Sequence, residues 1–348
     1  MKMISFAPKL QNEFQLKLFF FKHNYQLLEV LGYIALFIVS IGILVKSSDW
    51  FVDSAEEIGL SFGISPFIIG VTIVAFGTSL PELAASVAAV LAGDSEIVVG
   101  NVVGSNVANI CLVLGIVAVL SKSIKMDKRI IDLDIPILFA STFLFYFVLR
   151  DQKVEWWEGI FLLIGLIIFL ANSFGPTEST GNPDEEEAKN TSVRPQTYGM
   201  LVVGGVLVWL SATMVIESIQ FLSTYAGIPS EIIAVTFVAI GTSLPEVVVS
   251  VTAARKGNAA MAIGNVLGSN IFNTFAVMGI PALIGTLAIP DSIMSFSMPF
   301  MIVITLLFTV VTITSKITRW EGYVFLLLYA YFMTQLVVDT LEKMSLAG

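Results

Sequence analysis

Long apolar stretches separated by short polar ones occupy almost the whole chain. A helix needs roughly 20 apolar residues, within a range of about 17 to 25, to cross the hydrocarbon core of a bilayer. The stretches that meet this requirement predict about ten transmembrane helices in an all-α polytopic membrane protein. They lie near residues 29–46, 64–91, 97–120, 130–150, 157–173, 199–218, 229–254, 260–286, 294–315 and 321–341.

The composition strengthens this prediction. Of the 348 residues, 56% are hydrophobic and only 13% are charged, whereas a soluble domain has about 25% charged residues. The formal net charge is -9. No basic patch is present that could neutralise phosphates, which argues against a nucleic acid as a partner. The partner that the composition predicts is the lipid bilayer, and it predicts no particular protein partner.

Cysteine and histidine are almost absent. Cys111 is the only cysteine, so the chain can form no intrachain disulfide or thiolate metal cluster. His23 is the only histidine and lies in the N-terminal tail, which excludes histidine-based catalytic triads and histidine-rich metal sites within one chain. An intramembrane hydrolase therefore has little support. We expect a protein that is not an enzyme and has no cofactor.

Residues 174–197 interrupt the apolar pattern with glycines, prolines and the acidic run 184–187. Such a composition predicts a flexible cytoplasmic linker. The four adjacent acids lack the alternating spacing of a calcium loop, which favours a solvated loop over a regulatory cation site. The linker would separate a first five-helix repeat, 29–173, from a second, 198–348. Residues 1–28 do not resemble a cleaved signal sequence and are expected to form an N-terminal tail.

One hexapeptide occurs twice within the predicted spans. The sequence Gly-Thr-Ser-Leu-Pro-Glu covers residues 77–82 and again residues 241–246, so that Glu246 follows Glu82 by 164 residues. With about five spans in each copy, an odd number, the second copy must enter the membrane upside down relative to the first. This is the inverted-repeat plan of secondary transporters, in which the substrate binds near the bilayer midplane at the repeat interface.

Each hexapeptide gathers oxygen atoms around an acid. Residues three and four apart share a helix face, so Thr78 and Ser79 are neighbours of Glu82. The second copy repeats the arrangement with Thr242, Ser243 and Glu246. An ionisable residue inside a membrane span is costly and usually functional. Two glutamates at equivalent positions therefore indicate one site that both repeats assemble.

A proline precedes each glutamate. Pro81 has no N–H and its ring crowds the carbonyl four residues back, which should free the Gly77 carbonyl as a ligand. Pro245 is expected to do the same for Gly241. Irregular backbone at membrane depth is tolerated only where it lines protein or a water-filled cavity, so we expect the helix to kink or open here.

The span after each hexapeptide carries a polar stripe. Three polar residues recur at a spacing of four, which aligns them on one helix face. They are Asn101, Ser105 and Asn109 in the first copy and Asn265, Ser269 and Asn273 in the second. Small residues allow close helix approach in membranes; here they are Gly100, Gly104, Gly264 and Gly268. Asn106 and Asn270 lie one residue off the stripe and are expected to pack between helices.

All these groups are hard oxygen donors. Such ligands suit calcium or sodium, whereas zinc and copper prefer nitrogen and sulfur. Two carboxylates match the charge of one divalent ion. The alternative is that each glutamate only hydrogen-bonds its own hydroxyl neighbours and glues helices together. Identical spacing in two inverted copies favours the cation site.

The hexapeptide, followed 23 residues after its glutamate by the serine of Gly-Ser-Asn, resembles the alpha-repeats of the calcium/cation antiporter superfamily. Within it, the chain is similar to the prokaryotic sodium/calcium exchanger branch from about residue 30 to 341. The resemblance implies ten helices with cation positions between the second, third, seventh and eighth. It implies Glu82 and Glu246 as core ligands. The further ligands it implies are the hydroxyls of Thr78, Ser79, Thr242, Ser243, Ser105 and Ser269, the side chains of Asn109 and Asn273, and the carbonyls of Ala75 and Ala239.

One position departs from the resembled branch, whose best-known members have aspartate where this chain has Asn273. The missing acid leaves the counter-ion and the stoichiometry open. We expect a secondary active antiporter that exchanges calcium for sodium by alternating access. The resemblance implies that the first and sixth spans move against a fixed core. Proton/calcium or potassium-linked calcium antiport uses the same fold and remains the nearest alternative. A cation channel has less support, because it would place rings of charge around a symmetric pore.

Basic residues indicate the orientation in the cell membrane, because cytoplasmic loops are enriched in lysine and arginine. One set of alternating loops holds Lys46, Lys122, Lys125, Lys128, Arg129, Lys189, Arg194, Arg255, Lys256, Lys316 and Arg319. The other set holds only Arg150, Lys153 and Lys343. The contrast predicts that both termini lie outside, in the extracellular or periplasmic space, although the four lysines of the tail oppose it.

Four further polar residues recur at the same offset. Asp53 and Glu217 are expected to be interfacial anchors rather than cation ligands. Ser86 and Ser250 each lie four residues beyond a glutamate and are expected to satisfy the helix backbone.

Overall fold

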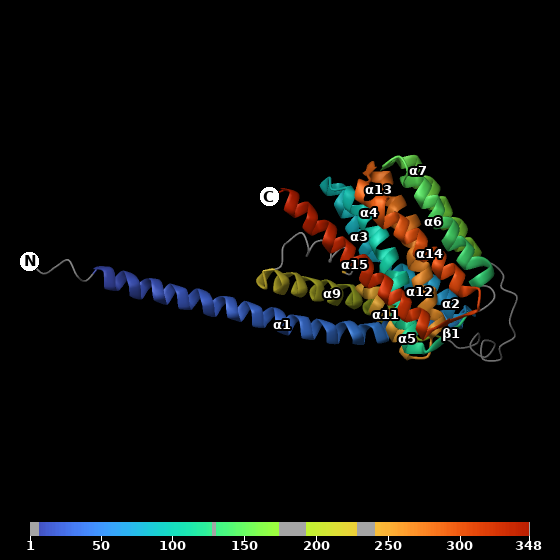
Figure 1. Ribbon diagram of the computed structural model, residues 1–348. Coiled ribbons are helices and arrows are strands. Elements are labelled where there is room, and N and C mark those ends of the chain that lie inside the picture. Colours follow the sequence, from blue (N-terminus) through green and yellow to red (C-terminus); the bar gives the residue numbers. More distant parts are fainter. Residues whose placement is uncertain (1–6, 127–129, 174–192, 228–240, 348) are drawn as a thin grey trace, which may run out of the picture.

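The computed structural model describes residues 7–126, 130–173, 193–227 and 241–347, and these residues form a bundle of helices (Figure 1). In the first half, π-helical turns, labelled η, interrupt two spans and begin the described part of a third. The elements are α1 (Ala7–Ser61), α2 (Pro66–Ile69), η1 (Gly70–Val74), α3 (Ala75–Ala92), α4 (Glu96–Ala108), η2 (Asn109–Val113), α5 (Leu114–Ser121), β1 (Ser123–Lys125), η3 (Ile130–Asp134), α6 (Ile135–Leu149), β2 (Lys153–Val154) and α7 (Trp156–Ser173).

The second half repeats this order. Its elements are α9 (Pro195–Tyr225), α11 (Leu244–Arg255), α12 (Ala259–Phe272), η4 (Asn273–Val277), α13 (Met278–Ile284), β3 (Leu287–Ala288), η5 (Ile293–Ser297), α14 (Met298–Thr312), β4 (Lys316–Thr318) and α15 (Arg319–Ala347). Most of the predicted linker lies outside the described residues, and α9 begins within its predicted end, at Pro195.

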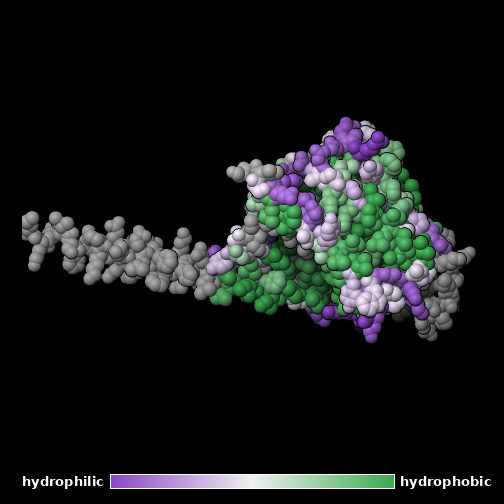
Figure 2. Space-filling view, in the orientation of Figure 1, coloured by the Kyte–Doolittle hydropathy of each residue, from purple (hydrophilic) through white to green (hydrophobic). Residues whose placement is uncertain are grey.

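Nine helices in the described part of the chain are long and apolar enough to cross a membrane. They confirm the prediction of an all-α polytopic membrane protein. Residues 229–240 of the predicted span 229–254 lie outside the described ranges, and α11 forms its described end. Hydrophobic side chains cover much of the flank of the bundle, and hydrophilic ones gather toward its two ends (Figure 2).

The first span is longer than predicted. The apolar pattern placed its end near residue 46 and its start at residue 29, but α1 is one continuous helix to Ser61. The extension persists because one face of it is buried, with Val52 and Ala55 both inaccessible to solvent. Its charged residues face partners near the end of the bundle and do not end the helix.

The strand pairs show that the two repeats are inverted. β1 and β3 occupy equivalent places in the two repeats, as do β2 and β4. β1 nevertheless pairs antiparallel with β4, and β2 with β3. Because α6 crosses the bundle between β1 and β2, these strands lie at opposite ends of the molecule. Equivalent loops of the two repeats therefore lie at opposite ends too, as an odd number of spans per repeat requires.

Close glycine contacts tie each repeat to the other. A Cβ atom on Gly159 of α7 would lie 2.8 Å from the carbonyl oxygen of Gly279 in α13. A Cβ atom on Gly322 of α15 would lie 2.8 Å from the carbonyl oxygen of Gly115 in α5. Only glycine permits such an approach of two backbones. The last helix of each repeat thus packs against the central span of the other.

The most buried of the described spans are α4–α5 and α12–α13, whereas α1 and α15 are the most exposed. The predicted close approach of the polar stripe is found at Gly264 and Gly268, where a Cβ would meet the carbonyls of Phe67 and Val71. Around Gly100 no described atom lies within 4 Å of a Cβ. The polar stripes are therefore carried by the two central spans of the bundle.

Candidate cation site

The two glutamates of the hexapeptides lie inside the bundle, one from each repeat. Glu82 is carried by α3 and Glu246 by the first turn of α11, and neither side chain is exposed to solvent. The helices that carry them, α3 and α11, pack against each other. Among the described residues, neither carboxylate oxygen of Glu82 has a hydrogen-bond partner, nor has Oε2 of Glu246. A buried charge without a partner is strongly unfavourable, so these oxygens need a cation or a proton.

Hydrogen bonds at the glutamates run between the repeats. Ser79 Oγ donates to Glu246 Oε1 over 3.2 Å, and Thr78 Oγ1 donates to Asn265 Oδ1 over 3.2 Å. In the opposite direction, Thr242 Oγ1 donates to Asn101 Oδ1 over 3.1 Å. The alternative in which each glutamate only bonds its own hydroxyl neighbours is therefore wrong, because the partner of Glu246 comes from the first repeat.

The serines of the polar stripes join the same cluster. Ser105 Oγ lies 3.0 Å from Thr242 Oγ1, and Ser269 Oγ donates to Asn265 Oδ1 over 3.4 Å. Ser243 Oγ is buried and has no partner among the described residues. Hydroxyls of both repeats thus take part in the polar contacts at the centre of the bundle, and one of them, Ser79 Oγ, reaches a carboxylate.

Asn109 and Asn273 occupy matching irregular positions. Each begins a π-helical turn, η2 or η4, and each is fully buried. In the described part of the chain, the amide oxygen and nitrogen of both side chains have no partner. Such π turns often lie at functional sites. η4 packs against α3 and η2 against α11, so each asparagine-bearing turn lies against the glutamate-bearing helix of the other repeat.

The two prolines act differently. Pro81 lies inside α3, a continuous helix that begins directly after the π turn η1. Pro245, in contrast, lies in the first turn of α11. The second copy is therefore opened and the first is not. The expected freeing of the Gly241 carbonyl is wrong, because this carbonyl accepts the backbone N–H of Leu244 over 3.3 Å. α11 begins at Leu244, and the N–H of this residue supplies the donor that the proline lacks.

Of the two alanine carbonyls, only one can be placed. The Ala75 carbonyl accepts Thr78 Oγ1 over 3.4 Å at the start of α3. Ala239 lies outside the described residues.

The expectation for Ser86 and Ser250 was wrong. Ser86 Oγ accepts Asn101 Nδ2 over 3.1 Å, and Ser250 Oγ accepts Asn265 Nδ2 over 2.8 Å. The signal that could have found these pairs is the shared spacing of 15 residues between serine and asparagine. Asn106 donates to Thr274 Oγ1 over 3.1 Å, which agrees with its expected role in helix packing.

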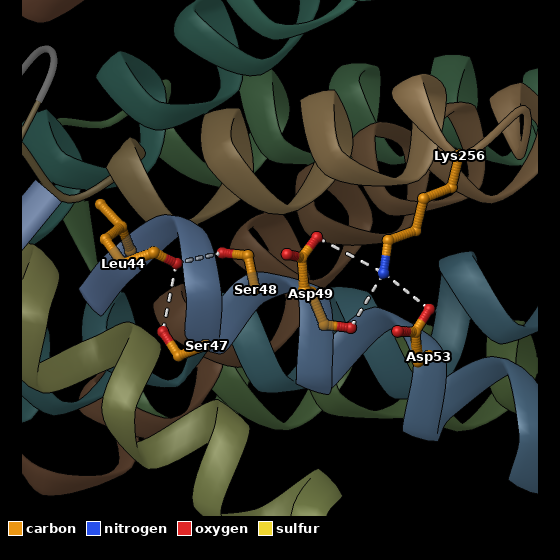
Figure 3. A network of polar contacts seen from close by, with 6 residues as sticks. All are labelled: Leu44, Ser47, Ser48, Asp49, Asp53 and Lys256. Carbon is orange, nitrogen blue, oxygen red and sulfur yellow. Dashed lines mark hydrogen bonds and ion pairs between the residues drawn. The ribbon is translucent and has the colours of Figure 1, made fainter. Parts of the chain in front are cut away.

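Asp53 lies away from the cluster, on the final turns of α1. Lys256, just beyond α11, places its Nζ 2.6 Å from Asp53 Oδ1 and 3.4 Å from Asp49 Oδ1 (Figure 3). On the same helix, Ser47 and Ser48 donate to the Leu44 carbonyl, which satisfies hydroxyls inside the helix. Asp53 is thus a contact between the first span and the second repeat.

The donor set resembles that of a site for hard cations. Among the described residues, no group of three or more His, Cys, Asp and Glu side chains comes together. What the bundle gathers instead is two carboxylates from opposite repeats with hydroxyl and amide groups around them. The model of one protein family, described as sodium/calcium exchanger protein, matches residues 32–175 and 197–338.

The chain belongs to this sodium/calcium exchanger family. The match covers both repeats and confirms the resemblance drawn from the hexapeptides. Sodium/calcium exchanger MaX1 of Methanosarcina acetivorans is 34% identical over 333 residues, which cover 84% of this chain and 95% of that protein. Inner membrane protein YrbG of Escherichia coli is 34% identical over 259 residues, which cover 72% of this chain and 79% of that protein.

Solved structures agree with the family. A structure of the sodium-calcium exchanger NCX_Mj soaked with Na⁺ and Sr²⁺ superposes with a TM-score of 0.76 at 31% identity, covering 88% of this chain and 98% of that one. Family membership makes the chain a multi-pass membrane protein of an exchanger family. It fits the expectation of a cation transporter rather than an enzyme.

Proposed function

We propose that this exchanger-family protein is a secondary active antiporter that exchanges calcium for sodium by alternating access. The observation that carries the proposal is the meeting of Glu82 and Glu246, buried from two inverted repeats and rich in unpartnered oxygens. Calcium takes about six to eight oxygen ligands. The ligands we propose are Glu82, Glu246, Thr78, Ser79, Thr242, Ser243, Ser105, Ser269, Asn109, Asn273 and the carbonyls of Ala75 and Ala239.

Coupling follows from shared ligands. Calcium and sodium would both need the carboxylates of Glu82 and Glu246, so the two cargoes cannot occupy the site together. The site then changes its exposure from one side to the other with either calcium or sodium bound. The gradient of one ion thereby drives the transport of the other in the opposite direction. No resident cofactor is needed for this cycle, since the ions themselves are the substrates.

The packing of α1 and α9 supports alternating access. α9 lies beside the C-terminal part of α1, which continues well beyond α9 toward the N-terminus (Figure 1). A cavity of about 810 Å³ separates part of this pair from the core, lined by Phe51 of α1, Trp209 of α9 and Phe272 of α12 among other residues. Its almost wholly apolar walls offer few directional contacts. Beside the cavity, the α1–α9 pair can therefore shift against the core at little cost in hydrogen bonds. Its polar contacts with Lys256 lie on the final turns of α1.

The second candidate is proton/calcium antiport, and Asn273 favours it. The side chains of Asn109 and Asn273 are both neutral amides, so the two glutamates supply the negative charge of the site. Protons can take the place of sodium on such carboxylates. The two candidates differ in which gradient drives calcium.

Calcium-45 uptake into proteoliposomes separates them. Imposed gradients of sodium, potassium and protons are compared in the same preparation, with Glu82→Gln as the variant that loses a site carboxylate. We expect the sodium gradient to drive uptake and Glu82→Gln to abolish it. The matched control is Glu158→Gln, a buried acid that caps the N–H of Glu155 at α7 and lies outside the proposed ligand set. Uptake that follows only the pH gradient would replace sodium by protons, and unchanged uptake in Glu82→Gln would refute the site.

We also propose that the end of the bundle bearing β1, β4 and Lys256 faces the cytoplasm, with both termini outside. This end carries most of the loop lysines and arginines, in agreement with the positive-inside tendency. Cys111 is the only cysteine of the chain and is buried. In a Cys111→Ser background, a single introduced cysteine therefore reports on which side of the membrane it lies. Lys125→Cys should resist a membrane-impermeant maleimide in intact cells and Gln152→Cys should react. The reverse pattern would invert the orientation.

A further inference from the structure

Two asparagines make the same contact in opposite directions between the repeats. Asn265 of α12 donates to Ser250 of its own repeat and accepts from Thr78 of the other, over 2.8 and 3.2 Å. Asn101 of α4 donates to Ser86 of its own repeat and accepts from Thr242 of the other, over 3.1 Å in each case. Each hexapeptide threonine is therefore held by the opposite repeat.

The direction of these hydrogen bonds is fixed by chemistry at Asn101. Its Nδ2 also lies 3.2 Å from the backbone carbonyl of Glu82, and a carbonyl can only accept. A flipped amide would set two oxygens against each other. Oδ1 must therefore face Thr242, and Thr242 must be the donor. The partners of Asn265 are hydroxyls, which can donate or accept. We assign it the same orientation because it occupies the place of Asn101 in the inverted repeat.

A threonine that gives away its proton can offer only lone pairs to the space that remains. The hydroxyl has one donor hydrogen and two acceptor lone pairs. With that hydrogen on the asparagine oxygen, Thr242 cannot turn a proton toward the carboxylates. Thr78 has two acceptors within reach, and the asparagine is the nearer one, at 3.2 Å against 3.4 Å for the Ala75 carbonyl. Asn101 and Asn265 are at most 3% exposed, and at membrane depth water does not compete for these bonds. The threonine oxygens are thus held as acceptors, which is what a cation ligand requires.

We propose that Asn101 and Asn265 are positioning residues. Each orients the threonine of the opposite repeat toward the cation and holds the two half-sites at a fixed separation. The proposal rests on the proposed function, since it assigns a role within the same cation site. A fixed separation makes the cage discriminate by ion size. Loss of one asparagine lets the half-sites spread and admits larger divalent ions more readily.

The test measures ion preference in addition to activity. Calcium-45 uptake by Asn265→Ala and Asn101→Ala proteoliposomes is competed with barium, the larger ion. We expect apparent calcium affinity to fall by on the order of tenfold, because a buried partner is left unsatisfied, and the preference for calcium over barium to fall with it. An unchanged preference in both variants would overturn the proposal.

The control is another buried hydrogen bond between the repeats. Asn106→Ala removes the 3.1 Å contact with Thr274 and should lower thermal stability without altering ion preference. If Asn106→Ala changes the preference as Asn265→Ala does, the effect is general loosening and the proposal fails.

Thr78 supplies an independent pair of variants if the asparagine variants do not fold. Thr78→Ser keeps the donor hydroxyl and should retain ion preference, whereas Thr78→Val should lose it. Combining Thr78→Val with Asn265→Ala should cost no more than either change alone, since both break one contact. Equal behaviour of Thr78→Ser and Thr78→Val would refute the role of the hydroxyl. Suppose that the wild type transports calcium, that Glu82→Gln abolishes this transport, and that the asparagine variants behave like the wild type. That result would refute this inference alone. A wild type that does not transport calcium would refute the proposed function.

Discussion

The centre of the bundle and the final turns of α1 follow different rules. At the centre, contacts come in matched pairs, with Asn101 bonded to Thr242 and Asn265 to Thr78. On the final turns of α1, Lys256 binds Asp53, but the repeat equivalent of Lys256 is Ala92 and that of Asp53 is Glu217. The symmetric contacts lie at the cation site that we propose, to which both repeats contribute. The asymmetric contact lies where the repeats meet different sides of the membrane.

This difference has a consequence for alternating access. In an inverted repeat, the two access states are approximately exchanged by the internal symmetry. A contact that exists in both repeats leaves the relative stability of the two access states unchanged. A contact that exists in a single repeat favours one of these states. We therefore expect changes at the centre to affect cation binding and changes at Lys256 to affect the balance of states.

The largest expected effect comes from the glutamates. Glu82→Gln and Glu246→Gln should each reduce calcium uptake by about 100-fold or more, because breaking a buried charged contact costs roughly 3–5 kcal/mol. Since both carboxylates hold the same ion, the double variant should be little worse than either single one. Uptake by proteoliposomes at saturating gradient is the measurement. If each single variant reduced uptake only in part and the two reductions added in the double variant, the repeats would bind cations separately.

The next effect is that of pH. Protonation of either glutamate removes a charge that calcium needs, so uptake should fall as the pH is lowered from 8 to 5. The measurement is calcium-45 uptake at constant sodium gradient across this range, with the internal and external pH kept equal. Flat activity over the whole range would show that protons do not compete at the carboxylates.

What the sequence predicted most clearly was which residues to propose for the site. Two identical hexapeptides at a constant offset marked Glu82 and Glu246, and the spacing of four marked the polar stripes. The cross-repeat partners could not be predicted, because Asn101 and Thr242 are 141 residues apart and only folding brings them together. Ser86 was misjudged for a different reason, since its partner Asn101 lies only 15 residues away on the next span and the recurrence of this spacing in both repeats was overlooked.

The length of α1 shows a second limit of the sequence pattern. Charged residues after position 46 resembled the end of a membrane span. In the fold, Asp49 and Asp53 meet Lys256, which lies 203 residues beyond Asp53, and the helix continues. The inverted arrangement, in contrast, was predictable, because an odd number of spans per repeat permits no other topology.

A moderate effect is expected at the glycine contacts between repeats. Gly159→Ala places a methyl group 2.8 Å from the Gly279 carbonyl oxygen, and overpacking of this kind costs about 1–3 kcal/mol. Thermal unfolding in detergent should show a lower midpoint. Gly199→Ala is the matched control, because no described atom lies within 4 Å of a Cβ there. Equal midpoints for both variants would place the close contact in doubt.

The smallest effect on stability is expected at Lys256. Lys256→Met removes a partly exposed ion pair worth about 1 kcal/mol or less, and the loss should shrink at high salt. The same change should alter the ratio of forward to reverse exchange rates by up to about fivefold. Lys316→Met, which removes an exposed lysine of β4, is the charge control. An unchanged ratio would show that the asymmetric contact does not bias the access states.

The central claim is that both repeats build one cation site that calcium and sodium share. Isothermal titration of purified protein with calcium tests it most directly. We predict one calcium ion bound per chain, weaker binding as sodium is raised, and no detectable binding in Glu246→Gln. Calcium binding that is insensitive to sodium, or that persists in Glu246→Gln, would contradict the account.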